Sequence, residues 1–399
     1  MHAAGTVGRD VRVMGLVGSA HSLSHFYQLC LPPLFPFVKA EFGVGYSELG
    51  LLATLFYATS GLAQTPAGFM VDRFGARNVL FAGLGLLAAA TAAYGLAPGF
   101  WGLVPLVMLA GLGNSVFHPA DYSILTASVS QPRLGRAYGA HTIGGNLGWA
   151  AAPVSALALE ALVGWRGALI LLGLGGLVAL AVIAQGRELL RYEAVKRTGA
   201  AEALLPLISR PVVLCFVYFV LLAVALIAVQ TFLPPLLEQL HGTPLELASV
   251  ALTAFLLGNS AGILAGSVLA DRTTRHDLIV AVGLAGGAIM LLVVAEASLP
   301  DMGLVAAITL AGVMVGVTTP SRDMLVRGAA PRGATGRVFG FVYSGLDLGS
   351  SLAPLAVGLM LDYGRADLAF WAVAVGLGLA VFTALSLKRA TPVAVAPAE

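Results

Sequence analysis

The sequence predicts an all-α membrane protein with twelve transmembrane helices. Of its 399 residues, 58% are hydrophobic and only 11% are charged, whereas about a quarter of the residues in soluble domains are charged. Stretches such as 78–98 and 278–298 contain almost no charge, and they reach the ~20 residues that a helix needs to cross a hydrocarbon core. These apolar runs are continuous, whereas a β-barrel would show short segments of alternating hydrophobicity.

Charged residues, prolines and glycines set the bounds of the expected spans. In the first half of the chain, we expect helices over 13–38, 46–70, 78–98, 100–127, 137–161 and 167–185, delimited in turn by Arg12, Gly45, Arg77, Gly99, Arg136 and Arg166. In the second half, we expect helices over 211–238, 245–270, 278–298, 302–326, 337–361 and 367–387, delimited by Arg210, Pro244, Asp277, Asp301, Asp362 and Lys388.

The distribution of basic residues predicts the orientation of these spans. Of the 22 lysine and arginine residues, Arg322 falls inside a span, and only Lys39, Arg166 and Arg365 fall on one side of the membrane. The others lie on the opposite side. Because basic loops face the cytoplasm, both termini are expected there, with the protein in the cytoplasmic membrane. The net charge of +2 is spread over the loops, so no nucleic-acid-binding patch is implied.

The two halves of the chain repeat each other. Residues 135–153 read GRAYGAHTIGGNLGWAAAP and residues 336–354 read GRVFGFVYSGLDLGSSLAP, with eight matches at a constant offset of 201. We therefore expect two six-helix domains, 1–186 and 211–399, joined by a cytoplasmic linker over 187–210. Duplicated halves are typical of carriers in which two bundles rock about a site near the middle of the membrane.

The loop after the second span carries a motif. It reads GFMVDRFGARN at 68–78, and GSVLADRTTRHD at 266–277 is a weaker copy after the eighth span. This pattern resembles the cytoplasmic motif of the major facilitator superfamily. The resemblance implies two six-helix bundles around a central cavity, lined mainly by spans 1, 4, 7 and 10. It also implies that ion pairs and helix-end contacts of four residues gate the cytoplasmic side: Asp72, Arg73, Arg77 and Asp271. A simple topology anchor that follows the charge bias is the alternative, and the weaker copy leaves the choice open for Asp271.

Two further patterns resemble groups within this superfamily. The spacing of Gly139, Gly148 and Pro153 in the fifth span is similar to the antiporter motif, although the paired glycines that complete the motif are absent. The similarity implies that these three residues take part in gating of an exporter. The stretches SAHSLSHFYQLCLPPLFPF (19–37) and GLGNSVFHPA (111–120) look like transporters of the fosmidomycin-resistance type.

Several ionisable residues fall inside the expected spans. A charge near the bilayer centre costs roughly 2.5–3.5 kcal/mol on insertion scales, so such residues face a cavity or a partner. At the repeat offset, Asp121 on the fourth span corresponds to Arg322 on the tenth. We expect these two side chains at equivalent depth, facing each other or the substrate. The full set is Asp121, Arg322, Asp323, Asp347, His21, His25, His118 and His141.

His118 and Asp121 are three residues apart and share one helical face, while Pro119 between them removes a backbone donor. This stretch is therefore predicted to be a slightly broken helix that lines the translocation path. Carboxylate and imidazole groups there can exchange protons as water access changes sides. The candidates for proton coupling are Asp121, His118, Asp323 and Asp347. Bracing of neighbouring helices is the alternative for all of them.

Arg322 stays protonated and presents a planar fork that suits a carboxylate or phosphonate. It is therefore the candidate anion-binding residue, with bracing of the tenth span as the alternative. His21, His25 and Gln28 lie about one turn apart on one face of the first span, and we expect them to form a hydrogen-bonding wall for the substrate. The candidate substrate-binding residues are Arg322, Gln28, His21, His25, Tyr343 and Asn146. His141 is expected to bond to a neighbouring carbonyl group.

The spacing of His21 and His25 could also bind a metal ion, with His118 and Asp121 nearby. However, the sequence shows no second pair at ligand spacing, and no cysteine approaches. The hydrogen-bonding wall is therefore preferred, and neither a metal nor another cofactor is expected.

Together, these features predict a proton-coupled secondary transporter of a small organic anion or drug, with export favoured over uptake by proton symport. A membrane receptor that transports nothing is a further alternative, but no loop is long enough for a soluble output domain. An enzyme is not expected, because no nucleophile motif is present. The expected partners are the substrate, protons and the lipid bilayer, and the protein is expected to be a monomer.

Overall fold

The computed structural model describes residues 6–190, 209–329 and 335–390, and this part of the chain is helical without a β-strand. Nine of the helices found there are long and apolar enough to cross a membrane. The predicted all-α membrane class is confirmed. The helices are α1 (Val7–Gln28), α2 (Phe35–Phe42), α3 (Tyr46–Phe74), α4 (Ala76–Tyr94), α5 (Phe100–Asn114), α6 (Phe117–Ser128), α7 (Leu134–Gln185), α8 (Arg210–His241), α9 (Leu245–Asp271), α10 (His276–Glu296), α11 (Asp301–Ala329), α12 (Thr335–Asp362) and α13 (Ala366–Ala390), with short 3₁₀ turns η1 (Pro32–Leu34), η2 (Gln131–Arg133) and η3 (Arg187–Leu189).

These helices correspond to the twelve expected spans, although some spans are divided and two are joined. The first expected span, 13–38, is divided among α1, η1 and the start of α2, because Pro32 and Pro33 have no N–H group to continue the helix. The fourth span is divided into α5 and α6 near Ser115, whose carbonyl group cannot receive a hydrogen bond from Pro119. The fifth and sixth spans form α7, in which Gly164 has a non-helical φ of 70° and separates two helices.

Contacts between Cα atoms divide the chain into two compact units. The first unit comprises residues 1–197, 230–257 and 354–366, and the second comprises 198–229, 258–353 and 367–399. The first unit therefore combines the N-terminal helices with one end each of α8, α9 and α12. The expected division into halves remains a prediction, since most of the expected linker, 191–208, lies outside the described residues.

Within the first unit, the end of α12 is held against the start of α3. The two carboxylate oxygens of Asp362 accept hydrogen bonds from the backbone N–H groups of Tyr46, at 2.6 Å, and Ser47, at 2.7 Å. N–H groups in the first turn of a helix lack partners within the helix, so Asp362 caps α3. Gly45 leaves room for this contact, because a Cβ atom there would lie 2.6 Å from an Asp362 oxygen.

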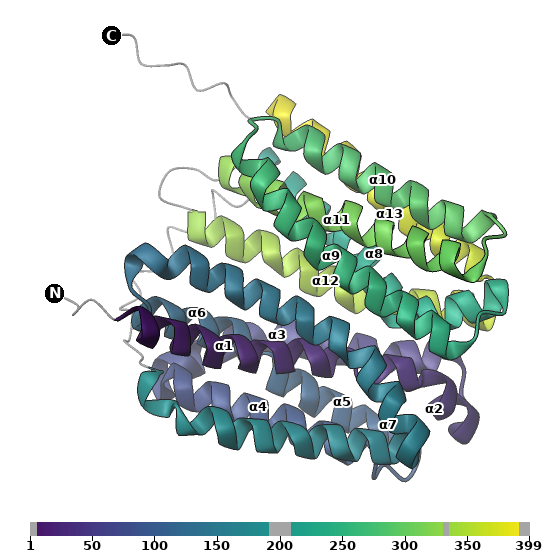
Figure 1. The fold of residues 1–399 in the computed structure, drawn as a ribbon, viewed down its shortest axis with the longest axis horizontal. Helices are drawn as coiled ribbons and strands as arrows, with labels where there is room; N and C mark the ends of the chain where they lie inside the picture. The colour runs from purple at the N-terminus through teal and green to yellow at the C-terminus, as the bar shows by residue number, and fades with distance from the viewer. Residues whose placement is uncertain (1–5, 191–208, 330–334, 391–399) are drawn as a thin grey trace. The chain divides into compact units, whose positions relative to one another are not determined.

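Repeated glycines allow equivalent helix packing in the two units. In the first unit, a Cβ atom at Gly144 on α7 would lie 2.9 Å from the carbonyl oxygen of Gly18 on α1. In the second unit, a Cβ atom at the repeat mate Gly345 on α12 would lie 2.8 Å from the carbonyl oxygen of Phe216 on α8. Helix α7 thus packs along α1 (Figure 1), and α12 approaches α8 closely at Gly345. This equivalence agrees with the repeat in the sequence.

Candidate functional site

The candidate site is a cluster of ionisable side chains inside the first unit. Asp121 on α6 is 0% exposed. Its Oδ2 atom lies 3.0 Å from Nε2 of His141 on α7, to which it is hydrogen-bonded, and 3.2 Å from Nδ1 of His21 on α1. Both imidazole side chains are buried. Three helices therefore place one carboxylate between two imidazoles.

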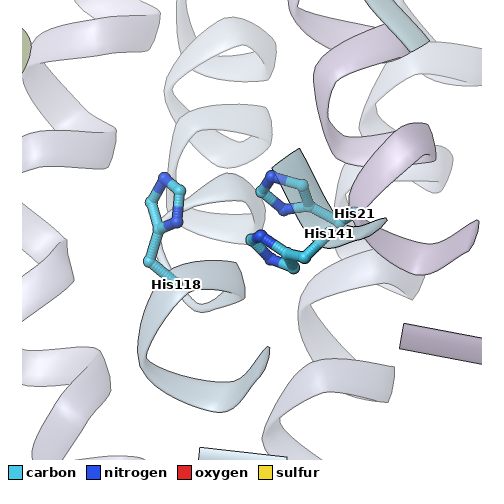
Figure 2. Close-up of side chains that lie close together, drawn as sticks. All are labelled: His21, His118 and His141. Atoms are coloured by element: carbon cyan, nitrogen blue, oxygen red, sulfur yellow. The ribbon is translucent and has the colours of Figure 1, made fainter. Parts of the chain in front are cut away.

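His118 lies at the accessible edge of this group. The rings of His21 and His141 stack with their centroids 3.5 Å apart, and the His118 ring lies 5.3 Å and 6.2 Å from them. Figure 2 shows His118 facing the stacked pair. The side chain of His118 is exposed, whereas the other two are buried. We call His21, His118, His141 and Asp121 the histidine cluster.

A glycine on α7 makes room for the histidines of α1. A Cβ atom at Gly145 would lie 2.7 Å from the ring of His25 and 3.0 Å from the ring of His21. The His25 ring stacks on Trp149, one turn further along α7, with 4.1 Å between centroids. The close approach of α1 and α7 therefore depends on the absence of a side chain at this position.

A hydrogen-bond network continues from the cluster along α1. Trp149 donates to the Gln28 side chain at 3.1 Å, and Gln28 donates to Asn114 at 3.2 Å. The same Asn114 oxygen accepts the Ser24 hydroxyl at 2.7 Å, while the Asn114 amide donates to Ser60 at 2.9 Å. The network joins α1, α3, α5 and α7. Gln28 is one of the candidate residues named from the sequence. Asn114 is not, and the one feature of the sequence that points to it is an amide side chain within an apolar run.

Arg322 and Asp323 on α11 form a separate polar group in the second unit. Nε of Arg322 donates to Oδ1 of Asp323 at 3.0 Å, and the hydroxyl of Tyr343 on α12 donates to the same oxygen at 3.0 Å. The guanidinium carbon lies 4.7 Å from the ring centroid of Phe219 on α8 and 5.9 Å from that of Tyr343. Aromatic faces attract a cation at such distances, so they hold the guanidinium beside its neighbouring carboxylate.

The two expected central charges each have a partner within their own unit. Asp121 is paired with histidines of its own unit, and Arg322 with Asp323 of its own unit. That Asp121 and Arg322 face each other remains a prediction. His141 bonds to the Asp121 carboxylate rather than to the expected backbone carbonyl, because α6 and α7 pack together at that depth.

The remaining candidates inside spans have less distinctive surroundings. Asn146 is buried on α7, and its repeat mate Asp347 is half-buried on α12. The Ser351 hydroxyl donates to the backbone carbonyl of Asp347 at 2.7 Å. The roles proposed for Asn146 and Asp347 stay predictions.

The candidate gating residues of the loops lie at helix ends. Asp72 and Arg73 are exposed in the last turn of α3, and Asp271 is exposed at the end of α9. Arg77 in the first turn of α4 donates to the backbone carbonyl of Arg187 at 3.2 Å. All four residues lie within helices rather than in the expected loops, because α3, α4 and α9 extend further than the expected spans. Their gating role remains a prediction.

The candidate gating residues of the fifth span lie on α7. A Cβ atom at Gly148 would collide with the carbonyl oxygen of Ser22 on α1, whereas a Cβ atom at Gly139 would meet nothing within 4 Å. Pro153 lies inside the helix without ending it. Gly148 is therefore a helix-packing position, and no close contact explains Gly139.

An ion pair links α2 to α7 beside the break at Gly164. Nη2 of Arg166 lies 2.8 Å from Oε1 of Glu41, and the indole N–H of Trp165 donates to Oε2 of Glu41 at 2.6 Å. The hydrogen bond from Arg166 is the main reason that the pKa of Glu41 lies below its ordinary value.

Comparisons of the sequence and the fold with known proteins all find similarity to membrane transporters. The family model described as Major Facilitator Superfamily matches residues 17–251 and 231–399. The fosmidomycin resistance protein of Escherichia coli (strain K12) is 24% identical over 367 residues, covering 90% of this chain and 88% of that protein. The probable sulfoacetate transporter SauU of Cupriavidus necator is 26% identical over 282 residues, covering 66% and 65% of the two chains. The structure of a bacterial homolog of the human lysosomal transporter Spinster, in an inward-facing and unoccupied conformation, has the same fold, with a TM-score of 0.82, 14% identity and coverage of 97% and 98%.

Proposed function

Because the chain belongs to the major facilitator superfamily, we propose that this multi-pass membrane protein is a proton-coupled secondary transporter of a small organic anion. In this proposal it works by alternating access in the cytoplasmic membrane, as a monomer with both termini in the cytoplasm. The observation that carries the proposal is the hydrogen bond between the fully buried Asp121 and His141.

The histidine cluster supports proton coupling. A carboxylate buried in the membrane needs a partner or a proton to offset its desolvation. Asp121 has two imidazoles within 3.2 Å, so that a proton can be held between them. His118 is exposed next to this buried pair and provides the connection to water. In the proposed cycle, binding of this proton favours the state that is open to one side of the membrane. Its release favours the state that is open to the other side.

The Arg322 group supports an anionic substrate. A guanidinium has five N–H donors in a planar fork, and the bond to Asp323 takes one of them. The others suit a carboxylate, sulfonate or phosphonate group. Phe219 and Tyr343 flank the cation and hold it in place. The similarity to a protein named as a probable sulfoacetate transporter supports an organic acid as the substrate.

Export is favoured as the direction of transport. The similarity to a protein named for fosmidomycin resistance extends over 90% of the chain, and the fifth span carries most of the antiporter pattern. Uptake of an organic acid by proton symport is the second candidate, supported by the similarity to the sulfoacetate transporter. In both directions, Asp72, Arg73, Arg77 and Asp271 are proposed to gate the cytoplasmic side. Asp362 is proposed to close the other side through its contact with α3.

Solute flux in proteoliposomes tests the proposal. The purified protein is reconstituted, a pH gradient is imposed in either direction, and the movement of labelled sulfoacetate and of small carboxylates and phosphonates is measured. Flux that responds to the sign of the gradient is expected, and that sign separates antiport from symport. A protein that binds one of these anions without moving it would be a receptor instead. Transport of cations alone would overturn the proposed substrate class.

A further inference from the structure

Four of the seven histidines of the chain lie together in the first unit, next to the carboxylate of Asp121. They come from three helices: His21 and His25 from α1, His118 from α6 and His141 from α7. Polar groups are costly to bury in an apolar bundle unless they have partners. A concentration of imidazoles at one point therefore calls for a ligand that several of them share.

The separations within the histidine cluster are close to those of a metal site. Zinc binds nitrogen and oxygen ligands at about 2.0–2.2 Å, so that two ligands of a tetrahedral ion lie roughly 3.4 Å apart. Oδ2 of Asp121 lies 3.0 Å from His141 and 3.2 Å from His21. The ligand nitrogens of His21, His118 and His141 all lie within 4.8 Å of one another. The proposed site therefore requires a rotation of the exposed His118 side chain toward the other ligands.

Unsatisfied atoms mark the same place. Among the described residues, Nδ1 of His25 and Oδ1 of Asp121 are buried without a hydrogen bond, and Nδ1 of His21 has only its 3.2 Å contact with Oδ2 of Asp121. Buried polar atoms of proteins almost always have a partner. Imidazole nitrogens and carboxylate oxygens such as these can coordinate a cation through their lone pairs. In this proposal an ion enters at His118, the exposed member of the cluster.

From this geometry we infer that His21, His118, His141 and Asp121 bind a divalent transition-metal ion of the zinc class. Imidazole nitrogens suit Zn²⁺, Co²⁺, Ni²⁺ and Cu²⁺, whereas Mg²⁺ and Ca²⁺ take oxygen ligands. Three imidazoles and one carboxylate fill the four positions of a tetrahedral ion. The bound ion ties α1, α6 and α7 together.

Binding of the ion does not depend on the proposed transport function. The expectation that the ion also stops transport does rest on it, because the ion would occupy the groups that the proposed function uses for protons. Binding and flux are therefore measured separately.

Titration with Co²⁺ tests the site directly. The full-length protein, purified in detergent without a polyhistidine tag, is titrated while its visible absorption is recorded. We expect saturation at one ion per chain, the intense bands of tetrahedral Co²⁺, and their loss when Zn²⁺ is added. His118→Asn is expected to weaken binding at least tenfold, and the double variant His21→Gln/His141→Gln to abolish it. His241→Gln, at the end of α8, is the matched control and should bind as the wild type does.

Thermal unfolding, measured with and without Zn²⁺, shows whether a variant that fails to bind metal is still folded. Zn²⁺ should raise the melting temperature of the wild type and of His241→Gln, because a ligand that binds only the folded state stabilises it. The shift should be smaller for His118→Asn, whose exposed side chain can be replaced with little effect on packing. Absence of saturable Co²⁺ binding in the wild type overturns the inference, as does unchanged binding in His118→Asn and the double variant. Metal binding without solute flux would overturn the proposed transport function but not the metal site. Solute flux without metal binding would overturn the metal site but not the transport function.

Discussion

Oδ1 of Asp362 accepts a hydrogen bond of 2.6 Å from the backbone N–H of Tyr46, a residue 316 positions earlier in the chain. The bond joins the last residue of α12 to the first residue of α3. A carboxylate at a helix N-terminus accepts hydrogen bonds from otherwise unpaired N–H groups and is stabilised by the helix dipole. In the proposed function, this contact between distant helices breaks when that end of the protein opens.

Replacement of Asp362 should therefore weaken this closure. Asp362→Ala removes the acceptor of two N–H groups, and loss of a helix cap costs about 0.5–2 kcal/mol. We expect a lower melting temperature and faster labelling of a cysteine placed at Ser47. Asp301→Ala, at the exposed start of α11, is the control. Unchanged stability and labelling in Asp362→Ala would show that the contact does not contribute to closure.

Asp121→Asn should abolish accumulation driven by a pH gradient and preserve exchange of solute across the membrane. The amide keeps the size of the side chain and a hydrogen-bond acceptor for His141, but it cannot carry the proton. Both modes are measured in the same proteoliposomes, with Asp301→Asn as the control. Undiminished pH-driven accumulation in Asp121→Asn would exclude Asp121 from proton coupling.

Arg322→Ala should weaken anion binding at least tenfold, which corresponds to about 1.4 kcal/mol. Arg322→Lys keeps the positive charge but loses the planar fork, so we expect an intermediate affinity. Ligand-induced thermal shifts report both, with the exposed Arg12→Ala as the control. If an anion that stabilises the wild type stabilises Arg322→Ala equally, the anion-binding role of Arg322 is wrong.

The pair of Glu41 and Arg166 should make stability depend on acid pH. The pKa of Glu41 in the folded protein lies below its ordinary value of 4.5, mainly through the hydrogen bond from Arg166. The folded state therefore favours the ionised form of Glu41, and this stabilisation is present above the ordinary value and is lost as pH falls through the folded pKa. Melting temperatures recorded from neutral pH to below 4.5 should fall less for Glu41→Gln than for the wild type. Parallel curves would contradict the prediction.

Much of the fold could be predicted because the signals are local. Charged residues such as Asp301, and breakers such as Gly99, delimit helices because charge and an unsatisfied backbone are excluded from lipid. Pro119 predicted the break in the fourth span, since the missing N–H group acts on its own helix. The match of Gly144 to Gly345 predicted equivalent packing, because a duplicated sequence tends to repeat its contacts.

The contacts of the site could not be predicted in this way. Spacing along one helix suggested that His118 and Asp121 share a face, but it could not bring His21 and His141 to the same carboxylate. That meeting depends on the rotation of three helices and on the space at Gly145. Asn114 and Asp362 were missed for the same reason, since their partners lie 54 or more residues away.

The sequence by itself determined that this chain spans the membrane many times and that its halves repeat, because hydrophobicity acts within a single helix. Only the tertiary structure decided which polar side chains meet, because burial requires each of them to find a partner and the partner comes from another helix.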